Sequence, residues 1–442
     1  MLPEEFLKRM ARLLGPEYEA FLASYDKPSM PGLRQNLLRK RDLPLPYVSE
    51  PVPWAPGGYY YDPANRPGLD PRHDAGLYYL QEPSAMAPAA LLAPLPGERV
   101  LDLCGAPGGK STQLASFLRG EGLLVSNEIV FSRAKILSQN IERMGIANAL
   151  VLSEHPAKLA SRFPGYFDKI MVDAPCSGEG MFRKEEAALR DWSPEQVLIC
   201  ARRQREILES AGEMLKPGGR MVYSTCTFAP EENEGVLSDF LRAHPDFSLA
   251  EIPAPWFSPG RPDAVPEPAE GLEKAFRLFP HKLNGLGHFA AVLQRKGEAV
   301  PEKEKAASGE KCPPELRDFL RDMKITLPAG RLLSFGETLY LLPEPAPDLK
   351  GLKVLRPGLC LGIPKKGRFE PDHALALWAD CSAPSKDFAP EDPALSSYLR
   401  GEAIIGEESG WKRITVEGSP LGWVKGSNGM LKNHLPKGLR RY

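Results

Sequence analysis

Two cysteines are the side chains best suited to do chemistry in this chain. Cys176 lies in KIMVDAPCSGEGMFRK (169–184), and Cys226 lies in GRMVYSTCTFAPEENE (219–234). Each follows a short hydrophobic run that is typical of a buried parallel strand, and open α/β sheets bind their ligands at the carboxyl ends of such strands. Two thiols at neighbouring strand ends indicate covalent chemistry, in which one sulfur attacks and the other helps release.

A glycine-rich turn, DLCGAPGGK (102–110), joins a predicted strand to a predicted helix. Its glycines would let the backbone approach a ligand closely, and Asp102 ends the strand with a negative charge. The turn has neither the GxGxxG pattern nor the spacing of a P-loop. Glu128 ends the second strand, where a carboxylate can accept both ribose hydroxyls of a nucleoside. Because no pyrophosphate cradle is evident, we expect S-adenosylmethionine rather than NAD as the cofactor.

The elements that must position these residues follow a regular α/β pattern from about residue 97. Strands are predicted over 99–104, 123–128, 147–152, 169–174, 219–225 and 288–295, and helices over 110–119, 131–145 and 195–215. The last of these helices is predicted to end at the stop signal KPGG (216–219), and a further helix is predicted over 76–93. Strands that alternate with helices indicate a doubly wound parallel sheet.

Composition excludes several classes of protein. The 442 residues allow two to four domains, and a net charge of −1 means that contacts to RNA or DNA must come from local patches. No apolar run matches a signal peptide or a membrane span, so we expect a cytosolic protein without a membrane partner. The seven cysteines are scattered, which is typical of reduced thiols. No Cys-x-x-Cys pair or HExxH motif occurs, so no metal is expected.

Taken in order, these motifs resemble the RNA cytosine-C5 methyltransferases. The resemblance rests on DLCGAPGGK, the NE of the second strand, DAPCSGEGMFRK, STCTF, EEN, RLFPHKLNGLGHF (277–289) and GLYYLQEPSAM (76–86). With the tail it spans nearly the whole chain, and it is greatest for the bacterial small-subunit ribosomal RNA branch, which carries RNA-binding units after the catalytic domain. The resemblance implies a Rossmann-like methyltransferase domain that uses S-adenosylmethionine to methylate carbon 5 of cytosine in 16S rRNA, near the decoding region.

The chemistry of cytosine explains why such an enzyme needs thiols. Carbon 5 is a poor nucleophile until a thiolate adds to carbon 6 and converts the ring into an enamine. Asp173 is then the natural acid or hydrogen-bonding group for N3. Spacing leaves open which cysteine attacks, because DNA cytosine-C5 methyltransferases carry their nucleophile in a Pro-Cys pair, as at Cys176. In the RNA family that the chain resembles, the TC cysteine, here Cys226, attacks, while Cys176 assists proton removal and product release.

The resemblance also implies a cofactor site. The expected contacts are Cys104, Gly105, Ala106, Pro107, Gly108, Gly109, Lys110, Glu128, His155 and Asp173. Lys110 would lie between cofactor and substrate, whereas Cys104 would mainly pack beside the turn. Family members usually place an Asp after the third strand, on the adenine side. His155 occupies that position here, with Glu154 beside it, which leaves open whether His155 or a backbone group contacts the adenine.

Five segments are expected along the chain. They are an N-terminal RNA-binding extension (1–95), the methyltransferase domain (96–297), a linker (298–315), a small α/β domain (316–385) and a PUA-like RNA-binding domain (390–442). Phosphate contacts and stacking are expected from two basic stretches, Arg34, Arg39, Lys40 and Arg41 in the first, and Trp423, Lys425, Lys432, Lys437, Arg440 and Arg441 in the second. Met181, Phe182 and Arg183 are expected to line the base pocket.

The expected partner is 16S rRNA or the small ribosomal subunit, bound by a monomer. Two alternatives stay open at this point. One is the same reaction on transfer RNA, and the other is an RNA-binding ribosome-assembly factor that has lost catalysis. The presence of Asp173, Cys176 and Cys226 together argues against the second alternative.

Overall fold

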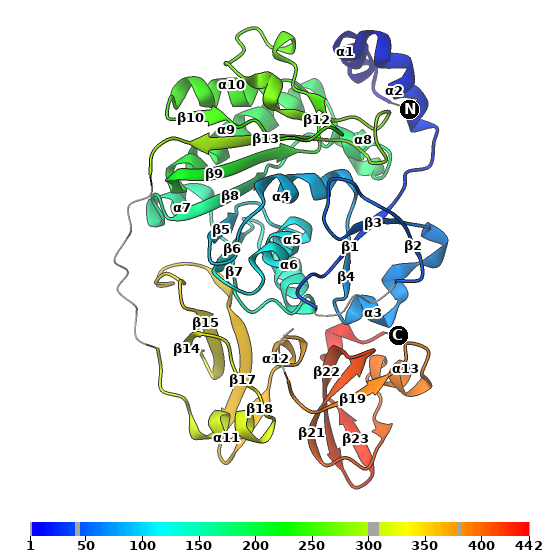
Figure 1. Ribbon diagram of the computed structural model, residues 1–442, viewed down its shortest axis with the longest axis vertical. Coiled ribbons are helices and arrows are strands. Elements are labelled where there is room, and N and C mark those ends of the chain that lie inside the picture. The colour runs from blue at the N-terminus through cyan, green and yellow to red at the C-terminus, as the bar shows by residue number, and fades with distance from the viewer. Residues whose placement is uncertain (1, 40–44, 299–308, 379–381, 442) are drawn as a thin grey trace.

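A ten-stranded mixed sheet lies at the centre of the computed structural model, which describes residues 2–39, 45–298, 309–378 and 382–441 (Figure 1). The strand order is β11-β12-β13-β9-β8-β5-β6-β7-β16, with β10 paired to β13. The strands are β5 Arg99–Asp102, β6 Leu123–Asn127, β7 Ala149–Leu152, β8 Phe167–Asp173, β9 Leu215–Thr225, β10 Phe247–Leu249, β11 Ser258–Pro259, β12 Phe276–Leu278, β13 His288–Arg295 and β16 Val354–Pro357. Strands β5 to β9 run parallel and β13 runs antiparallel to β9, so the expected Rossmann-like α/β class is confirmed.

Helices cover both faces of this sheet, because successive strand residues point to opposite sides. Val100 packs with the helices of one face, and Leu101 packs with those of the other. The first face carries α4 Ala87–Leu92, α5 Gly109–Leu118 and α6 Phe131–Arg143, and the second carries α7 Pro156–Arg162, α9 Pro194–Met214 and α10 Glu234–Ala243. The two resulting apolar layers hold the carboxyl ends of β5, β6, β8 and β9 at one edge of the sheet.

One sequence prediction about an element is wrong. The helix expected over 76–93 is instead a strand, β4 Tyr78–Leu80, a short 3-10 turn, Ser84–Met86, and the helix α4. The apolar residues of β4 pair with β1, and this long-range pairing overrides the local helical pattern. The helix expected over 195–215 is confirmed as α9, which ends at Met214, just before KPGG. The four residues 216–219 then lie inside β9, so the strand begins earlier than the expected residue 219.

The N-terminal extension combines two helices with a small antiparallel sheet. Its elements are α1 Glu4–Leu14, α2 Tyr18–Tyr25, β1 Gly32–Gln35, β2 Val48–Pro51, β3 Gly58–Tyr61 and β4, in the sheet order β2-β3-β1-β4, followed by α3 Pro71–Asp74. Phe6, Met10, Leu13 and Leu14 line the buried side of α1. They pack in one cluster with Phe182 and Phe228, which follow the two cysteines of interest, so the extension rests directly on the cysteine loops.

The C-terminal part forms two further sheets. One has the order β14-β15-β17-β18, with β14 Gly330–Phe335, β15 Thr338–Pro343, β17 Leu359–Lys365 and β18 Arg368–Pro371, beside α11 Pro314–Asp322 and α12 His373–Leu377. The other has the order β19-β21-β22-β23-β20, with β19 Ser385–Phe388, β20 Ile404–Ile405, β21 Gly410–Val416, β22 Ser419–Ser427 and β23 Met430–Asn433, beside α13 Pro393–Leu399. Strand β16 leaves the first of these units and pairs antiparallel with β7, so the C-terminal part completes the edge of the central sheet.

Several residues expected to hold RNA have structural roles instead. Arg34 is 1% exposed, and its guanidinium donates to the Thr112 hydroxyl and the Gly109 carbonyl. Trp423 is 1% exposed and donates to the Asp372 carbonyl, so it packs in a core. The expectation for these two residues is wrong, because their apolar and hydrogen-bonding surfaces are already used inside the protein.

The remaining residues of the two basic stretches divide into three groups. Arg39, Arg440 and Arg441 donate hydrogen bonds to backbone carbonyls elsewhere in the chain. Lys425, Lys432 and Lys437 are exposed and stay available for phosphate contacts. Lys40 and Arg41 lie outside the described residues, as do residues 299–308 of the expected linker.

Candidate active site

The two cysteines lie side by side at the carboxyl ends of neighbouring parallel strands. Cys176 follows β8 and Cys226 follows β9, and their Sγ atoms are 3.2 Å apart. Both side chains are half-buried. The hydrogen bond to Cys226, followed by burial, raises the pKa of the Cys176 thiol well above its ordinary value. Cys176 therefore stays protonated at neutral pH and can donate its hydrogen to the Cys226 sulfur.

Asp173 ends β8 beside this sulfur pair and is held by three partners. Its carboxylate accepts hydrogen bonds from Lys110 Nζ at 2.8 Å and from Ser224 Oγ at 2.8 Å. His288 Nε2 lies 3.5 Å from Asp173 Oδ1. Burial alone would raise the pKa of Asp173, but the Lys110 charge and the contact with His288 hold it well below its ordinary value. Asp173 is thus a carboxylate at neutral pH and accepts hydrogen bonds.

The glycine-rich turn connects β5 to α5, and its glycines serve the packing of the protein. A Cβ on Gly105 would lie 2.8 Å from Ser111 Oγ, and Gly108 has a φ of +118°, which L side chains rarely adopt. The space that a side chain would need at Gly105 and Gly108 is filled mainly by side chains of α5 and α6. The expectation that the turn lets a ligand approach its backbone stays a prediction.

One cavity of about 540 Å³ opens beside the sulfur pair. Of the predicted site residues, its lining includes Cys104, Ala106, Glu128, His155, Asp173, Cys176 and Cys226. Gly105, Pro107, Gly108, Gly109 and Lys110 belong to the adjoining turn but are not part of the lining. The expected base-pocket residues Met181, Phe182 and Arg183 do not line it either. Phe182 packs edge-to-face against Phe6 with ring centroids 5.1 Å apart, because it belongs to the core under the extension.

The part of this cavity farthest along the sheet suits a nucleoside. Glu128 is 4% exposed, and its Oε1 accepts the Val130 N–H at 2.9 Å, which leaves Oε2 near Arg133 at 3.3 Å. The apolar side chains of Ile129 and Val130 line the cavity beside it. A buried carboxylate can accept hydrogen bonds from ribose hydroxyls, and the apolar side chains can cover a base. The residues present therefore fit the expected cofactor.

His155 and Glu154 follow β7 but point in different directions. His155 is exposed at the cavity and caps α7, since its Nδ1 accepts the Ala157 N–H at 3.3 Å. Glu154 is turned away from the cavity. Its carboxylate accepts the Lys353 N–H at 2.7 Å and a hydrogen bond from Lys158 Nζ at 2.7 Å. Of these two side chains, only His155 can reach a ligand in the cavity.

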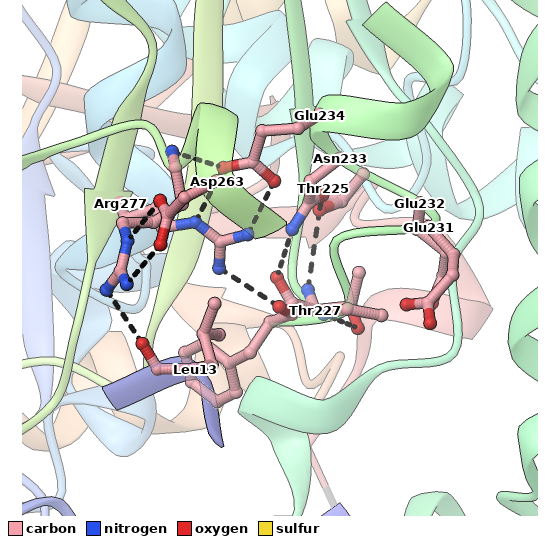
Figure 2. Close-up of polar contacts among 12 residues, drawn as sticks. Leu13, Thr225, Thr227, Glu231, Glu232, Asn233, Glu234, Asp263 and Arg277 are labelled. Atoms are coloured by element: carbon pink, nitrogen blue, oxygen red, sulfur yellow. Dashed lines mark hydrogen bonds and ion pairs between the residues drawn. The ribbon is translucent and has the colours of Figure 1, made fainter. Parts of the chain in front are cut away.

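Sequence reasoning missed several residues of the site. Arg203, Glu206 and Ile207 of α9 also line the cavity, and only their helical i, i+3, i+4 spacing could have suggested a shared face. The EEN motif received no role, although Asn233 links both ends of the Cys226 loop. It accepts from Thr225 Oγ1 at 2.6 Å and donates to the Thr227 carbonyl at 3.0 Å (Figure 2).

The polar network continues from this loop toward the N-terminal extension. The next residue, Glu234, forms a fully buried ion pair with Arg277 at 2.5 Å (Figure 2). Arg261 donates its backbone N–H to Glu234 and its guanidinium to the Leu13 carbonyl at the end of α1. Among the described residues, no group of three or more His, Cys, Asp or Glu side chains could hold a metal ion, and no helix is long and apolar enough to cross a bilayer.

Comparison with known proteins gives one consistent result over the whole chain. A family model described as 16S rRNA methyltransferase RsmB/F matches residues 89–294. Models of the N-terminal domain of 16S rRNA methyltransferase RsmF, the RsmF first C-terminal domain and the RsmF PUA domain match residues 2–83, 318–378 and 385–441. The ribosomal RNA small subunit methyltransferase F of Vibrio vulnificus (strain YJ016) is 32% identical and covers 100% of this chain and 98% of its own. The corresponding protein of Klebsiella pneumoniae (strain 342) is 33% identical, with 99% and 96% covered.

Two solved structures share the architecture of about two thirds of the chain. A methyltransferase homolog protein from Pyrococcus horikoshii superposes with a TM-score of 0.58 at 29% identity, covering 66% of this chain and 95% of its own. The NSun6 protein from Pyrococcus horikoshii, solved with SFG, gives a TM-score of 0.57 at 21% identity, covering 67% and 99%. At 21% identity, the second structure shows that the fold is shared and nothing more.

Proposed function

The chain belongs to the 16S rRNA methyltransferase F family of S-adenosylmethionine-dependent RNA methyltransferases, and from that premise we propose that it methylates carbon 5 of cytosine in 16S rRNA through a covalent cysteine adduct. The decoding region is the proposed location of the target. The single observation that carries the proposed chemistry is the pair of sulfurs, 3.2 Å apart, which opens into the same cavity as Asp173 and Glu128.

Cys226 is the proposed nucleophile. Its neighbour Cys176 has a raised pKa and lies 3.2 Å from the Cys226 sulfur, so Cys176 can donate a hydrogen bond to that sulfur. The Cys226 thiolate adds to carbon 6 of cytosine, and the electron pair of the C5–C6 bond becomes available at carbon 5. S-adenosylmethionine supplies an electrophilic methyl group when it is bound. Attack places negative charge on the ring, N3 takes up a proton from solvent to neutralise it, and the ionised Asp173 accepts a hydrogen bond from the resulting N3–H.

Release reverses the addition. A base, either the Cys176 thiolate or a water beside it, takes the proton from carbon 5, and the electron pair of that C–H bond re-forms the C5–C6 double bond. The bond between carbon 6 and Cys226 Sγ breaks, and its electron pair returns to the sulfur. Cys176 faces this sulfur and is proposed to assist both the proton removal and the departure of Cys226. Lys110, bonded to Asp173, fixes the carboxylate toward the cavity. The monomeric state, the cytoplasmic location and the segment boundaries stay predictions.

The proposed function is tested by the identity of the methylated atom and of the RNA. Purified enzyme is given S-adenosylmethionine with a labelled methyl group and, separately, small ribosomal subunits, naked 16S rRNA and transfer RNA. We expect label in 5-methylcytidine from one or both ribosomal substrates after digestion to nucleosides. Label on transfer RNA alone would reject the proposed substrate. Label on any other atom would reject the proposed chemistry.

Glu128→Ala is expected to raise the KM for S-adenosylmethionine about tenfold to hundredfold, because a hydrogen bond to a charged group contributes about 1.5–3 kcal/mol. The KM for RNA should change little. Glu154→Ala is the matched control, since both carboxylates are 4% exposed but Glu154 faces away from the cavity. Steady-state kinetics at varied cofactor concentration gives both values. An equal rise in the two variants would show that Glu128 does not contact the cofactor.

A further inference from the structure

The loops after the two cysteines are tied to each other by buried carboxylates that reach in opposite directions. Glu232, in the loop after Cys226, accepts the Ser177 N–H at 2.9 Å and a second hydrogen bond from the Ser177 hydroxyl. Gln204 on α9 donates to the same carboxylate at 2.8 Å. Burial raises the pKa of Glu232 to about 7. The residue directly after Cys176 is therefore held by a side chain from the other loop.

The opposite tie starts in the loop after Cys176. Glu179 is 0% exposed, and its carboxylate accepts the Phe228 N–H at 3.0 Å, two residues after Cys226. Its other oxygen accepts from Trp192 Nε1 at 2.9 Å and from the Arg9 guanidinium of α1. The loop after Cys226 is therefore held by a side chain from the Cys176 loop, which is itself anchored to the N-terminal extension.

The two loops also lie in close contact between these two carboxylates. Gly180 donates its N–H to the Cys226 carbonyl at 2.8 Å. A Cβ on Gly180 would lie 3.0 Å from that carbonyl and 2.7 Å from the Gly287 carbonyl, so only glycine permits this approach. The hydroxyls of Ser177 and Thr227 are 2.9 Å apart. Four contacts thus fix one loop against the other: Glu232 with Ser177, Glu179 with Phe228, Gly180 with Cys226, and Ser177 with Thr227.

The proposed reaction needs such a restraint. Attack and release use two different sulfurs, and no covalent bond sets the distance between them. A displacement of about 1 Å in a reacting group can cost about a hundredfold in rate. We infer that Glu232 is a positioning residue for Cys176 and that Glu179 is a positioning residue for Cys226, an inference that rests on the proposed function. Loss of Glu232 then slows release, whereas loss of Glu179 slows attack.

The two steps can be separated by trapping. Glu232→Ala is expected to lower kcat about tenfold to hundredfold with the KM for RNA unchanged, and to accumulate RNA that is methylated and covalently bound to the protein. Glu179→Ala is expected to lower kcat by a similar factor and to accumulate no adduct. A denaturing gel gives the bound fraction, and nuclease digestion of the bound RNA shows whether its cytosine carries the methyl group. Glu231→Ala is the matched control, because this neighbouring carboxylate is exposed.

Conservative variants separate positioning from folding. Glu232→Gln keeps an oxygen that can accept the Ser177 N–H, so it should recover most of kcat and lose the adduct. Purely structural carboxylates would instead lower the melting temperature and the active fraction in proportion to kcat, with the same bound fraction in every variant, and this result would overturn the inference. Cys176→Ala runs in parallel. If it traps RNA and Glu232→Ala does not, the positioning role is wrong while the proposed function stands. If neither traps RNA, the roles proposed for the two sulfurs are wrong as well, and the labelled-methyl assay decides whether carbon 5 of cytosine is still methylated.

Discussion

Cys176→Ala is expected to accumulate a covalent protein–RNA complex, and Cys226→Ala is expected to form none. The Cys226 thiolate can still attack carbon 6 when Cys176 is absent, but release then lacks its assisting group. Without Cys226 no bond to carbon 6 forms, and methyl transfer should fall by about 10⁴-fold or more, as is typical for loss of a nucleophile. The complex is measured on a denaturing gel after incubation with small-subunit RNA and S-adenosylmethionine.

The control for both variants is Cys200→Ala. Cys200 is 2% exposed on α9 and does not line the cavity, so its loss removes a thiol without touching the sulfur pair. Adduct formation by Cys226→Ala in place of Cys176→Ala would reverse the two roles and leave the enzyme class intact. This is the alternative that the Pro-Cys context of Cys176 keeps open from the sequence.

Asp173→Asn is the second large expected effect, with a loss in the rate of attack of about 10²- to 10⁴-fold. The amide keeps the shape of the carboxylate but removes the negative charge that would stabilise protonated N3. Because the effect falls on attack, a Cys176→Ala/Asp173→Asn double variant should form its covalent complex more slowly than Cys176→Ala by the same factor. Single-turnover gel assays measure this rate.

Asp168→Asn provides a matched control for the loss of a charge on β8. Asp168 and Asp173 lie on the same strand, and their side chains are equally exposed, at 29%. Each is paired with a lysine, Lys216 for Asp168 and Lys110 for Asp173. Asp168 lies far from the cavity, so its variant should lose stability without loss of the attack rate. Equal losses of rate in both variants would assign the effect of Asp173 to folding.

The parts of the fold that depend on local pattern could be predicted from the sequence. The runs before Cys176 and Cys226 each contain three consecutive apolar residues, 170–172 and 221–223, and each run lies in a strand of the central sheet, β8 or β9. The N-terminal sheet could not be predicted, because its strands are four residues or fewer and its strand β1 pairs with β3 and β4 across more than twenty residues of chain. Arg34 illustrates the same limit. In sequence it belongs to a basic run, but its neighbours in space are the hydroxyl of Thr112 and the carbonyl of Gly109.

The residues of the candidate site also fall into those that the sequence could predict and those that it could not. The sequence predicts the residue types at the strand ends, including Asp173 and Glu128, because motif and element coincide there. The partners of Glu179 and Glu232 lie 49 and 55 residues away in the chain, so no local pattern reveals them. Lys110 is an intermediate case, since its motif was recognised but its bond to Asp173 depends on the pairing of β5 with β8.

The strand β16 has a consequence for how the protein can be divided. Strand β7 is apolar and buried throughout, and β16 satisfies its outer backbone groups. A fragment truncated at residue 297 would leave β7 as a bare sheet edge, and an uncovered apolar edge invites pairing with another molecule. The catalytic domain of this protein is therefore not an autonomous module. Any shortened version would need a substitute strand, or charged residues on β7, to stay free of aggregation.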